Sequence, residues 1–212
     1  MKLKFREPVN AITHLIGSIF SIVVFYLLVN GSSYLSKKIA FTIYSLGMFL
    51  SFTSSFIYHS ITKNKSLIFV FKKIDHIMIY IFIAASYTPI SLIVLDKKIG
   101  ISLFIIIWII AVIGILLEVL IKNISRTLSA ANYLLMGWTA IIAIYPLYTS
   151  LPPNGFLLLV LGGVFYTIGA IIYAVKKPNF LKDILGFHEI FHIFVLLGSF
   201  THFLLMFLYI KG

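Results

Sequence analysis

Seven long apolar stretches, separated by short polar connections, make up almost the whole chain. Each is about as long as a helix must be to cross a bilayer, which takes roughly 17–25 residues. The pattern predicts an all-α integral membrane protein with seven transmembrane helices in a single domain covering residues 1–212. The expected helices are residues 11–30, 39–61, 74–95, 99–121, 130–150, 155–175 and 187–210.

The composition agrees with a chain surrounded by lipid. Hydrophobic residues make up 61% and charged residues 11%, whereas about a quarter of the residues in a soluble domain are charged. The mean hydropathy is +1.09. The net charge of +11 comes from lysines placed between apolar stretches, not from one basic face, so nucleic acid is not an expected partner. The chain has no cysteine, which excludes disulfides and thiolate metal sites.

Basic residues lie unevenly on the two sides of the predicted membrane. Twelve of the 17 fall on the side of the N-terminus and five on the other side. Because short basic loops stay in the cytoplasm, this predicts a cytoplasmic N-terminus and an outside C-terminus. The twelve are Lys2, Lys4, Arg6, Lys63, Lys65, Lys72, Lys73, Lys122, Arg126, Lys176, Lys177 and Lys182; the five are Lys37, Lys38, Lys97, Lys98 and Lys211.

Ionisable side chains within the apolar stretches gather in one predicted leaflet. His14 opens the first helix, His59 closes the second, Asp75 opens the third, and His188 and His192 open the seventh. The predicted topology brings all five near the cytoplasmic face. Ionisable groups inside a membrane are costly and commonly mark a functional site.

The spacing of these residues favours a metal site. His188 and His192 are four residues apart, so both project from one helix face and can bind one ion. Ser55 and His59 have the same spacing. Three histidines with an open position are the usual ligands of a catalytic zinc ion, which activates a bound water. Asp75 is the expected carboxylate beside that water.

Simpler interpretations stand beside this one. An H-x-x-x-H pair alone is more often polarity at the membrane interface, and Ser55 can bond back to its own helix. His76 follows Asp75 directly, so it is expected to face elsewhere at the interface. His202 is expected to hydrogen-bond inside the bundle, and Glu118 to pair with Lys122 four residues later. The roles of Glu7, Asn10, His14 and Glu189 stay open.

Several segments resemble the haemolysin III branch of the progestin and adipoQ receptor family, which is related to alkaline ceramidases. They are "EPVNAITHLIG" (7–17), "SSFIYHS" (54–60), "IDHIMIY" (74–80), "ASYTPI" (85–90) and "GFHEIFHIFVLLGSFTHF" (186–203). The resemblance implies seven transmembrane helices, a bacterial plasma-membrane location and a zinc ion near the cytoplasmic face. It assigns the zinc to His59, His188 and His192, with Asp75 holding the water and Ser55 beside it.

Two classes of function follow as expectations. The first is a zinc-dependent hydrolase of a lipid amide or ester, whose membrane lipid enters a cavity among the second, third and seventh helices. The second is non-enzymatic: a cytolytic or membrane-perturbing protein, or a lipid-responsive receptor, in which zinc is structural. Structural zinc usually has four protein ligands, and only three histidines converge here, which favours the hydrolase. Neither the substrate nor the oligomeric state follows from the sequence.

Overall fold

The computed structural model describes residues 5–121, 124–181 and 185–212, and seven helices within these ranges are long and apolar enough to cross a membrane. The prediction of seven spanning helices is therefore confirmed. They are α1 (Pro8–Val29), α2 (Leu35–Ser60), α3 (Lys65–Pro89) with the π-helical turn η1 (Ile90–Val94), α4 (Lys97–Leu120), α5 (Arg126–Gly137) with the 3-10 segment η2 (Trp138–Ala143) and α6 (Ile144–Ser150), α7 (Pro153–Val175), and α8 (Phe187–Leu205) with the π-helical turn η3 (Met206–Ile210). Lys2, Lys4, Lys122 and Lys182, which enter the orientation prediction, lie outside the described residues.

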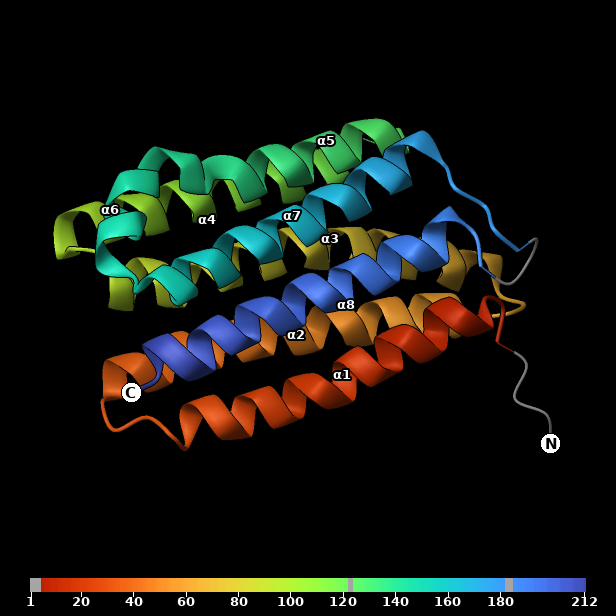
Figure 1. Ribbon diagram of the computed structural model, residues 1–212. Coiled ribbons are helices and arrows are strands. Elements are labelled where there is room, and N and C mark those ends of the chain that lie inside the picture. The colour runs from red at the N-terminus through yellow and green to blue at the C-terminus, as the bar shows by residue number, and fades with distance from the viewer. Residues whose placement is uncertain (1–4, 122–123, 182–184) are drawn as a thin grey trace.

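The helices run side by side along one long axis, and the two termini lie at opposite ends of the bundle (Figure 1). α2 packs between α1 and α3, α8 packs against α1 and α7, and α7 in turn packs against α5. α4 packs mainly against α3. The start of α1, the end of α2 and the start of α8 therefore meet at one end, which we call the N-terminal end of the bundle.

Local sequence explains where several helices begin. The side chains of Asn64, Asp96 and Ser125 accept hydrogen bonds from backbone N–H groups two or three residues later, at 3.0, 3.0 and 3.2 Å. Such caps satisfy N–H groups that have no partner within a helix. Pro8 and Pro153 stand at the first positions of α1 and α7, where a missing N–H costs nothing.

The outer surface of the bundle is apolar, as the composition requires. On α4, Ile105, Ile109, Val112 and Leu116 are each about half exposed and recur at helical spacing along one side. In water such a stripe would be a large unfavourable patch, whereas in a bilayer lipid chains cover it. The protein is a multi-pass membrane protein.

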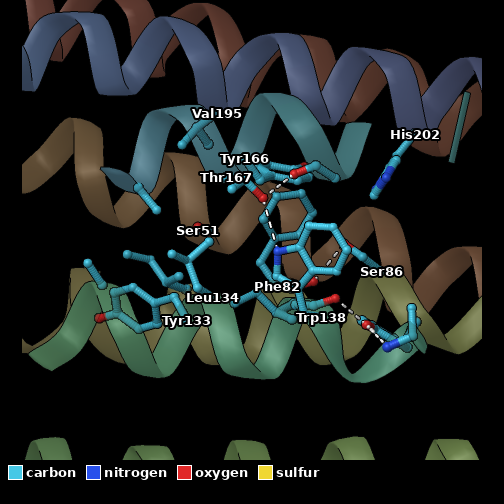
Figure 2. A pocket seen from close by; sticks show the side chains of 18 of the residues that line it. Ser51, Phe82, Ser86, Tyr133, Leu134, Trp138, Tyr166, Thr167, Val195 and His202 are labelled. Carbon is cyan, nitrogen blue, oxygen red and sulfur yellow. Dashed lines mark hydrogen bonds between the residues drawn. The ribbon is translucent and has the colours of Figure 1, made fainter. Parts of the chain in front are cut away.

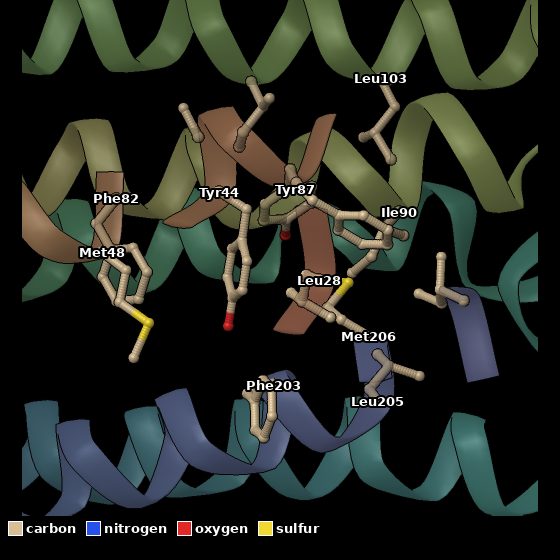
Figure 3. Close-up of a cluster of buried hydrophobic side chains, with 14 of the residues drawn as sticks. Leu28, Tyr44, Met48, Phe82, Tyr87, Ile90, Leu103, Phe203, Leu205 and Met206 are labelled. Carbon is tan, nitrogen blue, oxygen red and sulfur yellow. The ribbon is translucent and has the colours of Figure 1, made fainter. Parts of the chain in front are cut away.

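Large apolar side chains fill the half of the bundle opposite the N-terminal end. Tyr44 and Met48 of α2 pack with Phe82 and Tyr87 of α3 and with Phe203 of α8 (Figure 3). Leu28, near the end of α1, and Met206 are also fully buried there. This apolar core thus lies away from the end of the bundle where the start of α1, the end of α2 and the start of α8 meet.

Gly47 allows α2 and α3 to pack closely, and we expect Gly47→Ala to destabilise the protein. A Cβ atom at Gly47 would lie 2.5 Å from the Cβ of Ala85, so the helices would have to separate. Overpacking of this kind costs about 1–3 kcal/mol. The measurement is the free energy of unfolding in detergent. Gly163→Ala is the matched control, because nothing lies within 4 Å of its Cβ position, and equal stability of both variants would contradict the prediction.

The third helix begins earlier than the sequence pattern predicts. It starts at Lys65 instead of residue 74, because Asn64 caps it and the apolar residues 67–71 continue the same helix. Asp75 and His76 therefore lie inside α3, about three turns from its start at 3.6 residues per turn, and do not open it.

Candidate metal centre

Three histidines from two helices meet at the N-terminal end of the bundle. His59 comes from the last turn of α2, and His188 and His192 from the first two turns of α8. One possible ligand atom from each ring lies within 4.8 Å of the others, which is close enough for small side-chain movements to place all three on one ion. The structure thus brings together the histidines that the sequence selects.

Burial and hydrogen bonding give this cluster the character of a ligand set. His59 and His192 are almost completely buried. Within the described residues, His59 Nε2 and His192 Nδ1 are both buried and have no hydrogen-bond partner. Buried polar atoms in proteins are nearly always paired, so these two nitrogens are suited to a partner that the chain does not supply. Neutral imidazole nitrogens are common ligands of zinc and of other transition-metal ions.

A fourth histidine lies against the cluster. The ring of His14, near the start of α1, stacks on His192 with centroids 3.7 Å apart and an angle of 15°. Neither ring nitrogen of His14 has a hydrogen-bond partner in the part of the chain that the structure describes. His14 therefore lies directly beside the three-histidine cluster and lines the site. The spacing of residues in the sequence does not predict this stacking.

A carboxylate from the segment before α1 contacts the cluster. Glu7 Oε2 lies 2.6 Å from His59 Nδ1 and 3.8 Å from His188 Nδ1. Burial by itself raises the pKa of Glu7, but the hydrogen bond to His59 and the electrostatic interaction with it lower the pKa by more, so that it falls to about 2. Glu7 is therefore ionised at neutral pH.

Asp75 and Ser55 line a cavity that also reaches the histidine cluster. The cavity has a volume of about 230 Å³, and His14, His188 and His192 form part of the same wall. Ser55 is almost fully buried and Asp75 is partly buried. The two residues selected from the sequence as catalytic thus face the space into which two of the three clustered histidines also project.

The cavity continues away from the cluster between apolar side chains. It extends to Leu147 and Leu159 and to His202, so that it runs between α3, the α5–α6 segment, α7 and α8. Figure 2 shows Trp138 reaching toward Tyr166 and Thr167, and its indole Nε1–H donates to Thr167 Oγ1 at 3.1 Å. The sequence predicts a cavity among the second, third and seventh spanning helices, which are α2, α3 and α8. The observed cavity is larger, because the fifth spanning helix (α5 to α6) and the sixth (α7) also line it.

The cavity wall includes residues on the membrane-facing surface. Trp138, Ile141 and Val160 line the cavity and are 51%, 60% and 41% exposed. Trp138 and Ile141 belong to η2 and Val160 to α7. The hydrogen bond from Trp138 to Thr167 connects these two segments. Part of the cavity wall therefore also belongs to the outer surface of the bundle.

His76 does not face away from Asp75, contrary to the sequence prediction, because both residues line the same cavity. It is buried, and its Nδ1 lies 3.0 Å from Glu118 Oε1 of α4. α3 begins well before His76, and this part of the helix packs against α4. Glu118 pairs with His76, while Lys122, its expected partner, lies outside the described residues. The prediction for His202 is confirmed, since its Nε2 lies 3.3 Å from the carbonyl oxygen of Leu159.

Comparison with known proteins agrees with the fold and with the sequence motifs. The family described as "Haemolysin-III related" matches residues 3–203. A hemolysin-3 homolog of Bacillus subtilis (strain 168) is 41% identical over 197 residues, which cover 92% of this chain and 89% of that protein. Hemolysin-3 of Bacillus cereus is 39% identical over 208 residues, covering 97% and 92%. The human monocyte to macrophage differentiation factor is 25% identical over 203 residues, covering 94% and 82%. The chain therefore belongs to the haemolysin III family, a bacterial branch of the progestin and adipoQ receptor family.

Proposed function

We propose that this protein is a zinc-dependent hydrolase of a membrane lipid amide or ester. The observation that carries the proposal is the cavity that Asp75 and Ser55 share with His188 and His192, two of the three clustered histidines. A metal site, a carboxylate and a hydroxyl that face one cavity are the groups that hydrolysis of a carbonyl compound requires.

Three histidines would hold the ion. His59, His188 and His192 supply neutral nitrogen ligands, and three protein ligands leave a position for water or substrate. When bound, zinc would polarise the substrate carbonyl and make water a stronger nucleophile at neutral pH. By the charge distribution of the sequence, this site would lie at the cytoplasmic face.

Asp75 and Ser55 would supply the remaining chemistry. Asp75 would accept a proton from the attacking water as the new C–O bond forms at the carbonyl carbon. The same proton would then pass to the leaving amine or alcohol as its bond to that carbon breaks. Ser55 would donate a hydrogen bond to the carbonyl oxygen, on which negative charge develops.

The shape of the cavity supports a lipid as the substrate. Its wall on α3 and the start of η1 extends from Asp75 to Ile90, which is about 22 Å at a rise of 1.5 Å per residue and comparable with a long acyl chain. The wall beyond the polar end is mainly apolar, and Trp138 and Ile141 stand where it meets the membrane-facing surface. A lipid would enter sideways from the bilayer and place its amide or ester at the polar end.

The test is turnover of a panel of lipid amides and esters by the purified protein in detergent or liposomes. We expect release of fatty acid from at least one member, loss of that release after removal of metal by a chelator, and recovery on adding zinc. Turnover that persists after complete metal removal would contradict a zinc-dependent mechanism.

The non-enzymatic alternative predicts different results in the same preparation. Two relatives carry the name hemolysin-3, which suggests damage to membranes. Zinc binding without turnover of any lipid, together with dye release from liposomes that contain the protein, would favour a lytic protein with structural zinc. Zinc binding with neither activity would favour a receptor.

A further inference from the structure

A second layer of polar side chains surrounds the histidine cluster. It consists of Glu7, which directly precedes α1, Asn10 in the first turn of α1, and Glu189 in the first turn of α8. Asn10 is completely buried, and its Nδ2 donates to Glu7 Oε2 at 3.1 Å and to Glu189 Oε1 at 2.8 Å. Both carboxylates are thus held by one amide group inside the protein.

Glu7 attaches to His59 at two points. Its backbone N–H donates to the carbonyl oxygen of His59 at 3.1 Å, and its side-chain Oε2 lies 2.6 Å from His59 Nδ1. An ionised carboxylate can only accept, so Nδ1 of His59 carries the proton in this contact. In the neutral ring the lone pair is then on Nε2, the buried nitrogen that has no partner within residues 5–121, 124–181 and 185–212.

Glu189 connects Asn10 and Glu7 to the start of α8. Its Oε2 accepts the backbone N–H of Gly186 at 2.9 Å, which caps the start of the helix that carries His188 and His192. Through Asn10, this cap is connected to Glu7 and so to the end of α2. The two helices that supply the histidines are thereby held at a defined separation.

We propose that Glu7 is a positioning residue of the metal site, which orients His59 through Nδ1, and that Asn10 and Glu189 extend this support to α8. The role rests on the zinc site of the proposed function. Ligating histidines commonly donate their second N–H to a carboxylate, which fixes the ring and makes the ligand nitrogen more basic. Loss of such a partner typically weakens metal binding about 10–100-fold.

The experiment compares zinc affinity in Glu7→Gln and in Glu118→Gln, measured by competition with a chelator on purified full-length protein in detergent. Glu118→Gln is a matched control, because it makes the same change in another histidine–carboxylate pair, the one with His76. We expect Glu7→Gln to bind zinc at least about 10-fold more weakly than wild type and Glu118→Gln to match wild type. Visible spectra with cobalt in place of zinc should also change in Glu7→Gln only.

The outcomes distinguish failure of the positioning role of Glu7 from failure of the proposed zinc-dependent function. Equal zinc affinity in Glu7→Gln and wild type would overturn the role of Glu7 and leave the zinc site intact. A wild-type protein that binds no zinc would overturn the proposed function and this role with it. If Glu7→Gln does not fold, Glu7→Asp keeps the charge but shortens the side chain, and unchanged affinity in that variant would also overturn the role.

Discussion

Replacement of Asp75 by asparagine is expected to reduce lipid hydrolysis by at least about 100-fold while the protein keeps its zinc. The carboxylate is the proposed proton acceptor, and general acid–base catalysis typically contributes about 10²–10⁴-fold. Asparagine has nearly the same size, so the cavity wall that Asp75 forms would be preserved. The measurement is kcat on the best lipid of the panel, together with the zinc content of the same preparation.

Asp96→Asn is the matched control for this substitution. Asp96 caps the start of α4 and accepts the backbone N–H of Lys98 at 3.0 Å, outside the cavity. We expect its kcat to equal that of wild type. Undiminished turnover in Asp75→Asn would show that another group accepts the proton, and loss of zinc in that variant would instead assign Asp75 to the ligands.

Replacement of His192 by alanine is expected to abolish zinc binding. His192 is buried in the cluster, and its loss leaves two histidines, fewer than the usual three protein ligands of a catalytic site. The zinc content should fall from about one ion per chain to nearly none. A ligand at 100 times its Kd stabilises the folded state by about 2.7 kcal/mol, so zinc should raise the unfolding temperature of wild type and not of His192→Ala.

His202→Ala is the control for this substitution. It removes a partly buried histidine ring from the same helix without removing a proposed zinc ligand. His202 also stands on α8 and lines the same cavity, but it is not part of the three-histidine cluster. We expect this variant to keep its zinc and its stabilisation by zinc. Zinc retained by His192→Ala, or lost equally from both variants, would contradict the assignment of ligands.

The membrane-spanning architecture was predictable from the chain, apart from some helix boundaries. Each segment that crosses a bilayer must by itself be a long apolar helix. The seven spans can therefore be recognised one by one, without knowing which helices pack together. The boundary of α3 was missed because its first turns, from Lys65 onward, mix lysines with apolar residues, and the cap at Asn64 gives only a weak signal. The same boundary placed Asp75 and His76 at the start of a helix, although both lie inside α3.

The histidine cluster was predictable for a different reason. Four-residue spacing places His188 and His192 on one helix face whatever surrounds the helix, and alternation of helices across a membrane brings His59 to the same end. The contribution of Glu7 was not predictable. It depends on how α1 is rotated against α2, and the residues in contact are 52 positions apart.

The sequence by itself determined that this protein spans a membrane seven times and gathers histidines and Asp75 toward one end, because both properties follow from hydrophobicity and helical period. Tertiary structure alone decided which polar groups meet: Glu7 with His59, Glu118 with His76, and His14 stacked on His192. It also decided the extent of the cavity. These features depend on the rotation and spacing of packed helices, which residues far apart in the chain set jointly.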